Sequence, residues 1–174
     1  MQSSRFLLLI GLLLSGAALA LPEDKNQPVE IEADAGDLDQ AKNQTVYTGH
    51  VKVTQGSMEL LADKVVIQYQ GTRPHEIIAT GRPARFRQLP ARGKAWIKGQ
   101  ANRIVYRIRA DEVLLSGNAL LEQEKDSFRS DRIVYDRRAG RLKAGASAGG
   151  KQRVKVVVHP SGKGEAKKGK KQKK

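Results

Sequence analysis

Cysteine is absent from the 174-residue sequence. Its absence excludes disulfides, thiol catalysis and cysteine-ligated metals, so a folded domain has to be stabilised by apolar burial and strand pairing. Helical periodicity is also missing, because after Ala20 no segment of about a dozen residues keeps apolar side chains three and four positions apart. Beyond Ala20 no apolar run approaches the roughly 20 residues that a membrane-spanning helix needs. We therefore expect a soluble, essentially all-β domain.

Catalytic signatures are missing as well. The sequence has no Gly-x-Ser-x-Gly elbow, no His-Glu-x-x-His helix and no Walker loop. Its three histidines, His50, His75 and His159, are far apart and lack metal-ligand spacing. We predict that the protein is not an enzyme and has no catalytic residues, no metal site and no cofactor.

The first twenty residues have the features of an export signal. Arg5 supplies a positive start, residues 6–14 form an apolar run, and Ala18-Leu19-Ala20 is a small-x-small cleavage site. The rival interpretation, an uncleaved membrane anchor, would need a longer apolar run. We predict a signal peptide at residues 1–20 that is cleaved after Ala20, one domain at residues 21–158, and localisation in the periplasm.

Basic residues exceed acidic ones by 14, and most of this excess falls into two parts. Residues 163–174 hold seven lysines against Glu165, and residues 21–162 carry a net charge of +7. A lysine-glycine segment cannot order itself by apolar burial, so residues 159–174 are predicted to be a disordered tail. Export disfavours nucleic acid as the partner of this tail. Binding of anionic lipid head groups and a role in solubility alone are both left open.

Two motifs recur in a fixed order about every 30 residues, which is typical of a stacked repeat architecture. One motif is a small residue followed by glycine and the other is a small residue, Asp or Asn, a basic residue and two apolar residues. The first occurs at Thr48-Gly49, Thr80-Gly81, Ser116-Gly117 and Ala144-Gly145, and the second begins at Ala62, Ala101 and Ser130. We interpret Gly49, Gly81 and Gly117 as bends between successive short strands.

Alternation of apolar and polar residues predicts strands with one dry and one wet face. Val51 and Val53 alternate with polar neighbours, and Ala84 and Phe86 do the same. Ala62 lies three positions before Val65, an odd spacing that one regular strand cannot place on one face. A corner or bulge at the intervening Asp or Asn is the favoured explanation; the alternative is that the next residue, as in Val66, Val105 and Val134, faces inward.

Several runs, in their order and spacing, resemble one known family. These runs are residues 28–34, 47–56 and 62–66, followed by 80–86, 115–119 and 131–135. The chain resembles, over residues 27–158, the OstA-like family of periplasmic lipopolysaccharide-export bridge proteins. The resemblance implies an open, V-shaped antiparallel β-jellyroll with an apolar interior groove. It also implies that the protein carries lipopolysaccharide, held by its lipid A moiety, between inner-membrane and outer-membrane components of the transport machinery.

The apolar faces supply candidate lipid contacts. An acyl chain of a dozen carbons would cost about 10 kcal/mol to leave in water, so a lipid with several chains needs a continuous dry channel. The candidates are Val29, Ile31, Val51, Val53, Phe86, Tyr106, Ile108, Ala119 and Leu121. The same alternation fits a closed sandwich, which would suit a periplasmic polysaccharide-binding or scaffolding repeat protein. A polyanion binder that uses the lysine tail is a third hypothesis.

Outward arginines and unpaired terminal strands complete the prediction. Arg85, Arg87 and Arg107 are candidates for contacts with lipid phosphates at the groove mouth, and a generic basic surface is the alternative. Fourteen to sixteen short strands in two layers would stack to about 35 to 40 Å. We expect head-to-tail self-association through segments near residues 29–33 and 154–158, because exposed sheet edges pair readily.

Overall fold

The computed structural model describes residues 23–90 and 94–159. The predicted signal peptide, its cleavage site and nearly all of the lysine-rich tail lie outside the described residues. The elements are α1 (Glu23–Asn26), β1 (Glu30–Glu32), β2 (Ala35–Asp39), β3 (Gln44–Gln55), β4 (Met58–Gln70), β5 (Arg73–Gln88), β6 (Ile97–Arg107), β7 (Glu112–Gln123), β8 (Asp126–Asp136), β9 (Arg141–Ala144), the 3-10 turn η1 (Gly145–Ala148) and β10 (Lys155–Val157).

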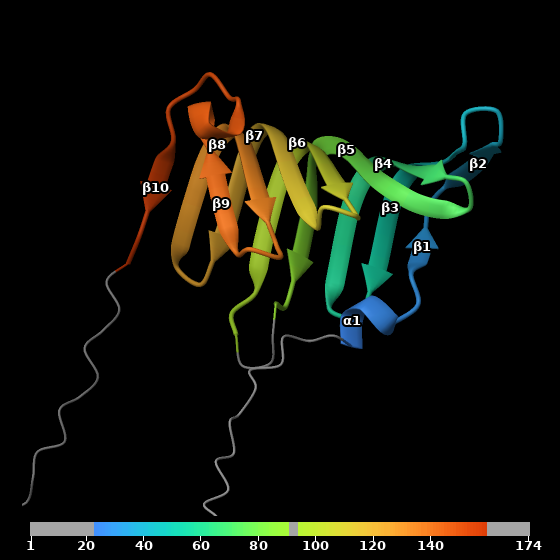
Figure 1. Cartoon of the computed structure of the whole chain (residues 1–174), viewed down its shortest axis with the longest axis horizontal. Helices are drawn as coiled ribbons and strands as arrows, with labels where there is room; N and C mark the ends of the chain where they lie inside the picture. Colours follow the sequence, from blue (N-terminus) through green and yellow to red (C-terminus); the bar gives the residue numbers. More distant parts are fainter. Residues whose placement is uncertain (1–22, 91–93, 160–174) are drawn as a thin grey trace, which may run out of the picture.

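All ten strands of the described residues belong to one antiparallel sheet. The order β1-β3-β4-β5-β6-β7-β8-β10 forms its main path, β2 pairs with β3, and β9 pairs with β8. Figure 1 shows these strands side by side along the long axis, with β1 and β2 at one end and β10 at the other. The sheet is open, since its first and last strands do not pair with each other. The prediction of an all-β, open jellyroll-like fold is confirmed.

Each long strand bends near its middle, where the hydrogen-bonded register shifts by one or two residues. Successive shifts lie between Thr48 and Val51, Leu61 and Lys64, Thr80 and Ala84, Gln100 and Arg103, and Ser116 and Ala119. Gly49 and Gly117 occupy these shifts with φ angles of 79° and 76°, a region that glycine enters at low cost. The prediction that Gly49, Gly81 and Gly117 separate short strands is wrong, because each lies inside one continuous strand. They form bulges inside continuous strands, so the backbone ladder passes through the bend.

The bend divides the sheet into two walls. Wall A comprises residues 44–48, 64–70, 73–80, 103–107, 112–116 and 132–136, and wall B comprises residues 51–55, 58–62, 84–88, 97–101, 119–123 and 126–130. Inward side chains of both walls form a single hydrophobic core. The walls therefore face each other across a common interior.

The odd spacing in the second motif is explained by the bend. Ala62 and Val65 both pack into the interior, as do Ala101 and Ile104. The corner interpretation is confirmed. The alternative is wrong, because Val105 belongs to a separate apolar row on the outer face of wall A. That row runs across five strands through the partners Val66, Ile78, Val105, Leu114 and Val134.

The expected number of strands was too high. The longest strand has 16 residues, because each one crosses both walls instead of ending at the bend. Eight strands along the main path still span about 34 Å, since neighbouring strands lie roughly 4.8 Å apart. A smaller correction concerns Ile108, which follows the end of β6 at Arg107 and lies in a turn.

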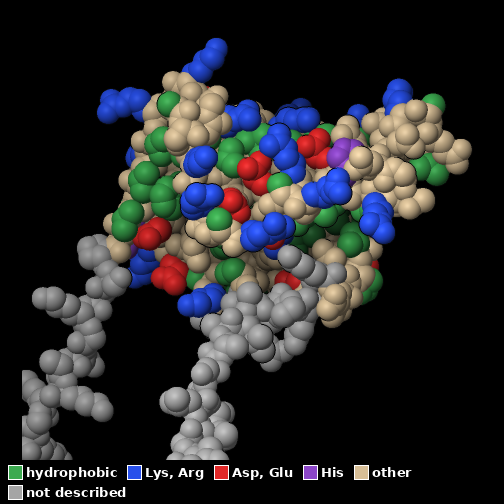
Figure 2. Space-filling model, in the orientation of Figure 1, with side chains coloured by type: hydrophobic (Ala, Val, Ile, Leu, Met, Phe, Trp, Pro, Cys, Tyr) green, Lys and Arg blue, Asp and Glu red, His purple; other side chains and the backbone are tan. Residues whose placement is uncertain are grey.

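The interior is most tightly packed at the bend, and the sheet ends are apolar and exposed. Leu115, Ile133 and Val65 have no exposed surface. At the two ends of the sheet, Val29 and Leu38 are exposed beside β1 and in β2, and Val156 is exposed in β10. Figure 2 shows hydrophobic side chains at the end occupied by β10, whereas Lys and Arg dominate the centre of the visible face. Among the described residues, no helix has the length and apolarity needed to cross a bilayer.

Candidate functional site

An apolar cleft of about 110 Å³ lies between the two walls. Wall B contributes Val53, Leu60 and Phe86, and wall A contributes Ile104 and Tyr106. These side chains meet because the strand halves on either side of the bend turn their apolar faces toward each other. A cleft with apolar residues on both sides favours a hydrocarbon ligand over a sugar or a nucleotide.

A second pocket of about 160 Å³ adjoins the first and reaches the rims of both walls. Both pockets share Phe86, Gln88, Val113, Asp24 and Arg137. The turns that follow β6 and β8 form the rim of wall A, and α1 with the residues after β5 forms the rim of wall B. The interior is therefore filled at the bend and accessible toward the rims.

Three polar side chains form a cluster where wall A meets the cleft. The Tyr106 hydroxyl donates a hydrogen bond to the Asp111 carboxylate over 3.0 Å, and Arg137 Nη1 lies 3.3 Å from the same oxygen. The Arg137 guanidinium also lies over the Tyr106 ring, 5.4 Å from its centroid. Asp111 is only 8% exposed. Burial is the main cause that raises the pKa of the Tyr106 phenol above its ordinary value, so the hydroxyl stays protonated and donates.

The opposite rim is closed by the N-terminal turn α1. The Asp24 carboxylate accepts hydrogen bonds from the Ser57 backbone N–H over 3.1 Å and from the Ser57 hydroxyl. The Leu89 backbone N–H donates to the same Ser57 hydroxyl over 3.1 Å. These bonds tie α1 to the β3–β4 turn and to the end of β5. Asp24 therefore lines the cleft as an anion that already has donors of its own.

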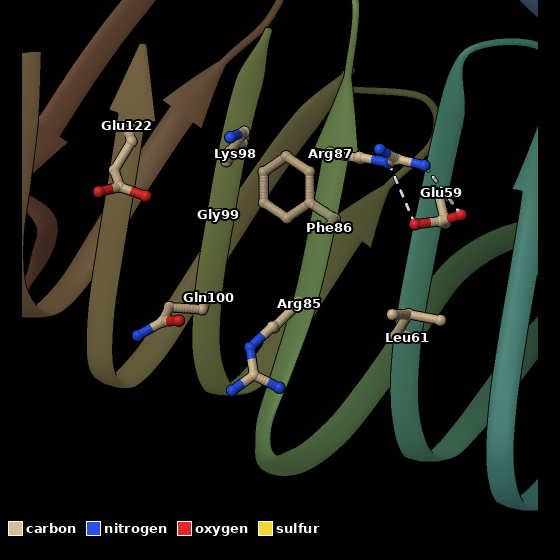
Figure 3. A pocket seen from close by; sticks show the side chains of 9 residues that line it. All are labelled: Glu59, Leu61, Arg85, Phe86, Arg87, Lys98, Gly99, Gln100 and Glu122. Carbon is tan, nitrogen blue, oxygen red and sulfur yellow. Dashed lines mark hydrogen bonds and ion pairs between the residues drawn. The ribbon is translucent and has the colours of Figure 1, made fainter. Parts of the chain in front are cut away.

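A separate hollow of about 390 Å³ lies on the outer face of wall B. Figure 3 shows charged side chains around it, with the Arg87 and Glu59 pair joined by dashed lines and the Phe86 ring beside Gly99. Arg87 Nε lies 3.1 Å from Glu59, and its guanidinium lies 5.3 Å from the Trp96 ring centroid. The hollow is larger than the cleft, but its charged rim suits a polar ligand and not an acyl chain.

The predicted lipid contacts occupy three different environments. Val53, Phe86 and Tyr106 line the cleft. Val51, Ala119 and Leu121 are buried in the packed interior, and Ile31 is half-buried against it. Ile108 is half-buried in the turn after β6, and Val29 is exposed before β1.

The predicted phosphate contacts point away from the cleft. Arg85 and Arg87 line the outer hollow of wall B, and Arg107 lies on the outer face of wall A. Arg107 is paired with Glu76 at 3.5 Å and with Glu112 at 2.9 Å. Their expected position at the groove mouth is not what the structure shows. The arginine at the mouth is Arg137.

Sequence reasoning missed the cluster of Asp111, Tyr106 and Arg137 as a unit. Asp111 and Arg137 are 26 positions apart in the sequence, and neither belongs to a recurring motif. They become neighbours because β7 and β8 pair in a register that sets Glu112 opposite Asp136. Within residues 23–90 and 94–159, no three His, Asp or Glu side chains lie close enough together to hold a metal ion.

Comparison with known proteins places this geometry among export proteins. Residues 30–141 match the family described as LptA/(LptD N-terminal domain) LPS transport protein. The lipopolysaccharide export system protein LptH of Pseudomonas aeruginosa is 34% identical over 157 residues, which cover 87% of this chain and 90% of the relative. The lipopolysaccharide export system protein LptA of Escherichia coli is 37% identical over 146 residues, or 83% of this chain and 77% of the relative.

The fold has a counterpart among solved structures as well. The crystal structure of LptH from Pseudomonas aeruginosa, described as the LptA homologous periplasmic component of a lipopolysaccharide transport device, superimposes with a TM-score of 0.72. The match has 30% sequence identity and covers 80% of this chain and all of the LptH chain.

Proposed function

The chain belongs to the LptA/LptD N-terminal family of lipopolysaccharide transport proteins, and we propose that it binds lipopolysaccharide in its cleft and carries it across the periplasm. It acts as a bridge segment between an inner-membrane transporter complex and an outer-membrane translocon. It is a transport component and not an enzyme, as the names of its relatives indicate. The periplasmic LptH structure supports the same compartment for this chain, and cleavage after Ala20 stays a prediction.

The observation that carries the proposal is an apolar cleft built from both walls of an open sheet. Each methylene removed from water contributes about 0.8 kcal/mol, so one acyl chain of a dozen carbons gains on the order of 10 kcal/mol from a dry channel. The saccharide can stay outside the cleft, in contact with water. The closed core that a scaffolding or polysaccharide-binding protein would have is not supported by an open sheet.

The cleft has to widen when a lipid enters. Its two pockets measure about 110 and 160 Å³, whereas sites for drug-sized ligands usually measure about 300 to 1,000 Å³. The walls are joined at the bend, and the pockets lie toward the rims, so the natural motion is separation of the rims. We assign Val53, Phe86 and Tyr106 to the first contacts with acyl chains. The buried candidates Val51, Ala119 and Leu121 would be reached only after this separation.

Photo-crosslinking tests the proposal with controls built into the strand alternation. A photoreactive phenylalanine at Phe86 or Tyr106 faces the cleft, and the same residue at Arg85 or Arg107 faces outward on the same strand. We expect lipopolysaccharide adducts, detected by mass spectrometry, at the two inward positions and none at the outward pair. Equal labelling on both faces would show that lipid does not enter between the walls.

The sheet ends support head-to-tail assembly. Three-residue strands, β1 and β10, are the terminal strands of the main path. Val156 and Val157 of β10 are 46% and 40% exposed, and Val29 beside β1 is exposed too. An edge strand with free backbone groups and apolar side chains is a template for pairing with another chain. The two ends differ, so such contacts do not close and give open oligomers or unions with related domains.

Light scattering over a concentration series tests this assembly. The wild-type mass should rise steadily with concentration, whereas Val156→Lys with Val157→Lys should stay monomeric because lysine on an edge strand opposes pairing. Lys98→Ala in β6, a central strand of the sheet, serves as a control away from both ends. A wild-type protein that stays monomeric at millimolar concentration would refute self-assembly while leaving lipid binding untouched.

A further inference from the structure

The cluster of Asp111, Tyr106 and Arg137 is unusual because it places charge beside an apolar cleft. The Asp111 and Arg137 side chains are 11% and 23% exposed, and Arg137 lines both pockets. Burying an ion pair is weak evidence for stability, since the desolvation penalty can exceed the attraction. Charged groups that are held in a cleft belong to a functional site more often than they serve stability alone.

Several contacts fix the guanidinium in place. The Arg137 backbone N–H donates to the Asp111 carbonyl oxygen over 3.0 Å, and Asp111 itself has a left-handed backbone with φ of 54°. Tyr106 provides a ring beneath the guanidinium and a hydroxyl bonded to the Asp111 carboxylate. A guanidinium has five N–H donors, and the ion pair with Asp111 is made through Nη1.

The surroundings favour an anion. The turns at residues 107–112 and 136–141 contain five arginines and three acidic residues. Arg107 and Arg141 are paired with acids of the strand ends, while Arg138 donates to the Arg109 carbonyl oxygen. The rim of wall A is therefore net positive even with Asp111 ionised. Across the cleft, the Asp24 carboxylate accepts hydrogen bonds from the Ser57 backbone N–H and from the Ser57 hydroxyl.

We propose that Arg137 binds a phosphate monoester on the saccharide of the acylated lipid, with Asp111 and Tyr106 as positioning residues. This inference rests on the proposed function and deepens it. A guanidinium can donate two parallel N–H bonds to phosphate, a geometry that an ammonium cannot reproduce. The phosphate then sits at the rim, and the acyl chains extend from it between Tyr106, Ile104 and Leu60. Arg137 thereby sets how deep and in which register the lipid lies.

The test compares two probes on the full chain: lipid A with both phosphates, and the same lipid after removal of its phosphates. Affinities are measured by displacement of a fluorescent acylated probe. We expect the wild type to prefer the phosphorylated lipid by roughly tenfold to a hundredfold, the range of a charge-assisted hydrogen-bonded pair. Arg137→Gln should bring the ratio near one without changing affinity for the dephosphorylated lipid, and Arg137→Lys should retain part of the preference.

Two further variants keep the test decisive. Arg138→Gln, the neighbouring exposed arginine, is the matched control and should keep the wild-type ratio. Asp111→Asn combined with Arg137→Gln also removes the buried negative charge that loses its Arg137 ion pair in the single variant, and it should lose the preference as well. If Arg137→Gln or the double variant keeps the wild-type preference for the phosphorylated lipid, Arg137 does not bind the phosphate. That result would leave the proposed function intact. A wild type that binds neither lipid overturns the proposed function as well.

Discussion

Replacement of Gly99 by alanine gives the sharpest test of how wall B is packed. Gly99 and Phe86 are partners across β6 and β5, and the Phe86 ring covers the bare backbone of the glycine (Figure 3). A Cβ atom on residue 99 would lie at overlap distance from ring atom Cε1 and 2.6 Å from Cζ. Since real Cβ contacts are never this short, the ring has to leave its position.

The expected cost follows from overpacking. Forcing an extra methyl group into a packed site costs typically about 1 to 3 kcal/mol. For a domain of this size each kcal/mol lowers Tm by roughly 3 to 5 °C, so Gly99→Ala should melt about 3 to 15 °C below the wild type. Gly36→Ala is the matched control. Its cross-strand partner is also aromatic, but the added Cβ would lie 3.4 Å from the Tyr47 ring, an ordinary contact.

A double-mutant cycle measured by urea unfolding separates this clash from other effects. Phe86→Ala removes the ring and lowers stability by itself. Gly99→Ala on that background should then cost less than about 0.5 kcal/mol, because the methyl group meets no ring. If the two changes add in full, the ring does not cover Gly99 and the description of wall B is wrong.

Three other measurements test separate parts of the fold. The hydrogen bond of 2.7 Å to Asp34 raises the pKa of the His50 imidazole above 6.5; an NMR titration should show this, and Asp34→Asn should abolish it. The contribution of this exposed pair is present below pH 6.5 and is lost as pH rises through the raised pKa. Leu115→Ala, at a site with no exposed surface, should cost about 2 to 5 kcal/mol in urea unfolding, whereas Leu61→Ala on the outer face should cost less than about 1 kcal/mol. Gly117→Ala should cost about 1 to 2 kcal/mol by the same assay, because residue 117 has φ of 76° and alanine resists that conformation; a neutral result would mean that the bulge relaxes.

Local patterns were sufficient to predict the inward and outward faces. Val51 and Val53 are two residues apart and share a face, as the pleat of a strand requires. Ala62 and Val65 are three residues apart and share a face because the bend reverses the pleat between them. These features depend on residues that are near each other in sequence. For the same reason the family resemblance, which rests on such runs, predicted the open jellyroll.

What could not be predicted depends on partners that are distant in sequence. The same dipeptide, a small residue followed by glycine, can end a strand or form a bulge inside one. Pairing with the neighbouring strand determines which of the two occurs. The predicted phosphate contacts Arg85, Arg87 and Arg107 lie away from the mouth of the cleft. Alternation predicts which face of a strand a residue occupies, but not how far that residue lies from the cleft. Arg137 was missed because its meeting with Asp111 depends on the β7–β8 register.

The apolar row on the outer face of wall A makes the two walls mechanically unequal. Val66, Ile78, Val105, Leu114 and Val134 link five strands from outside, while the core links the same strands from inside. On the outer face of wall B the cross-strand neighbours include Glu59, Arg87, Lys98 and Glu122, of which Glu59 and Arg87 form an ion pair. We therefore expect wall A to be the stiffer of the two, so that wall B bends more when a lipid enters the cleft.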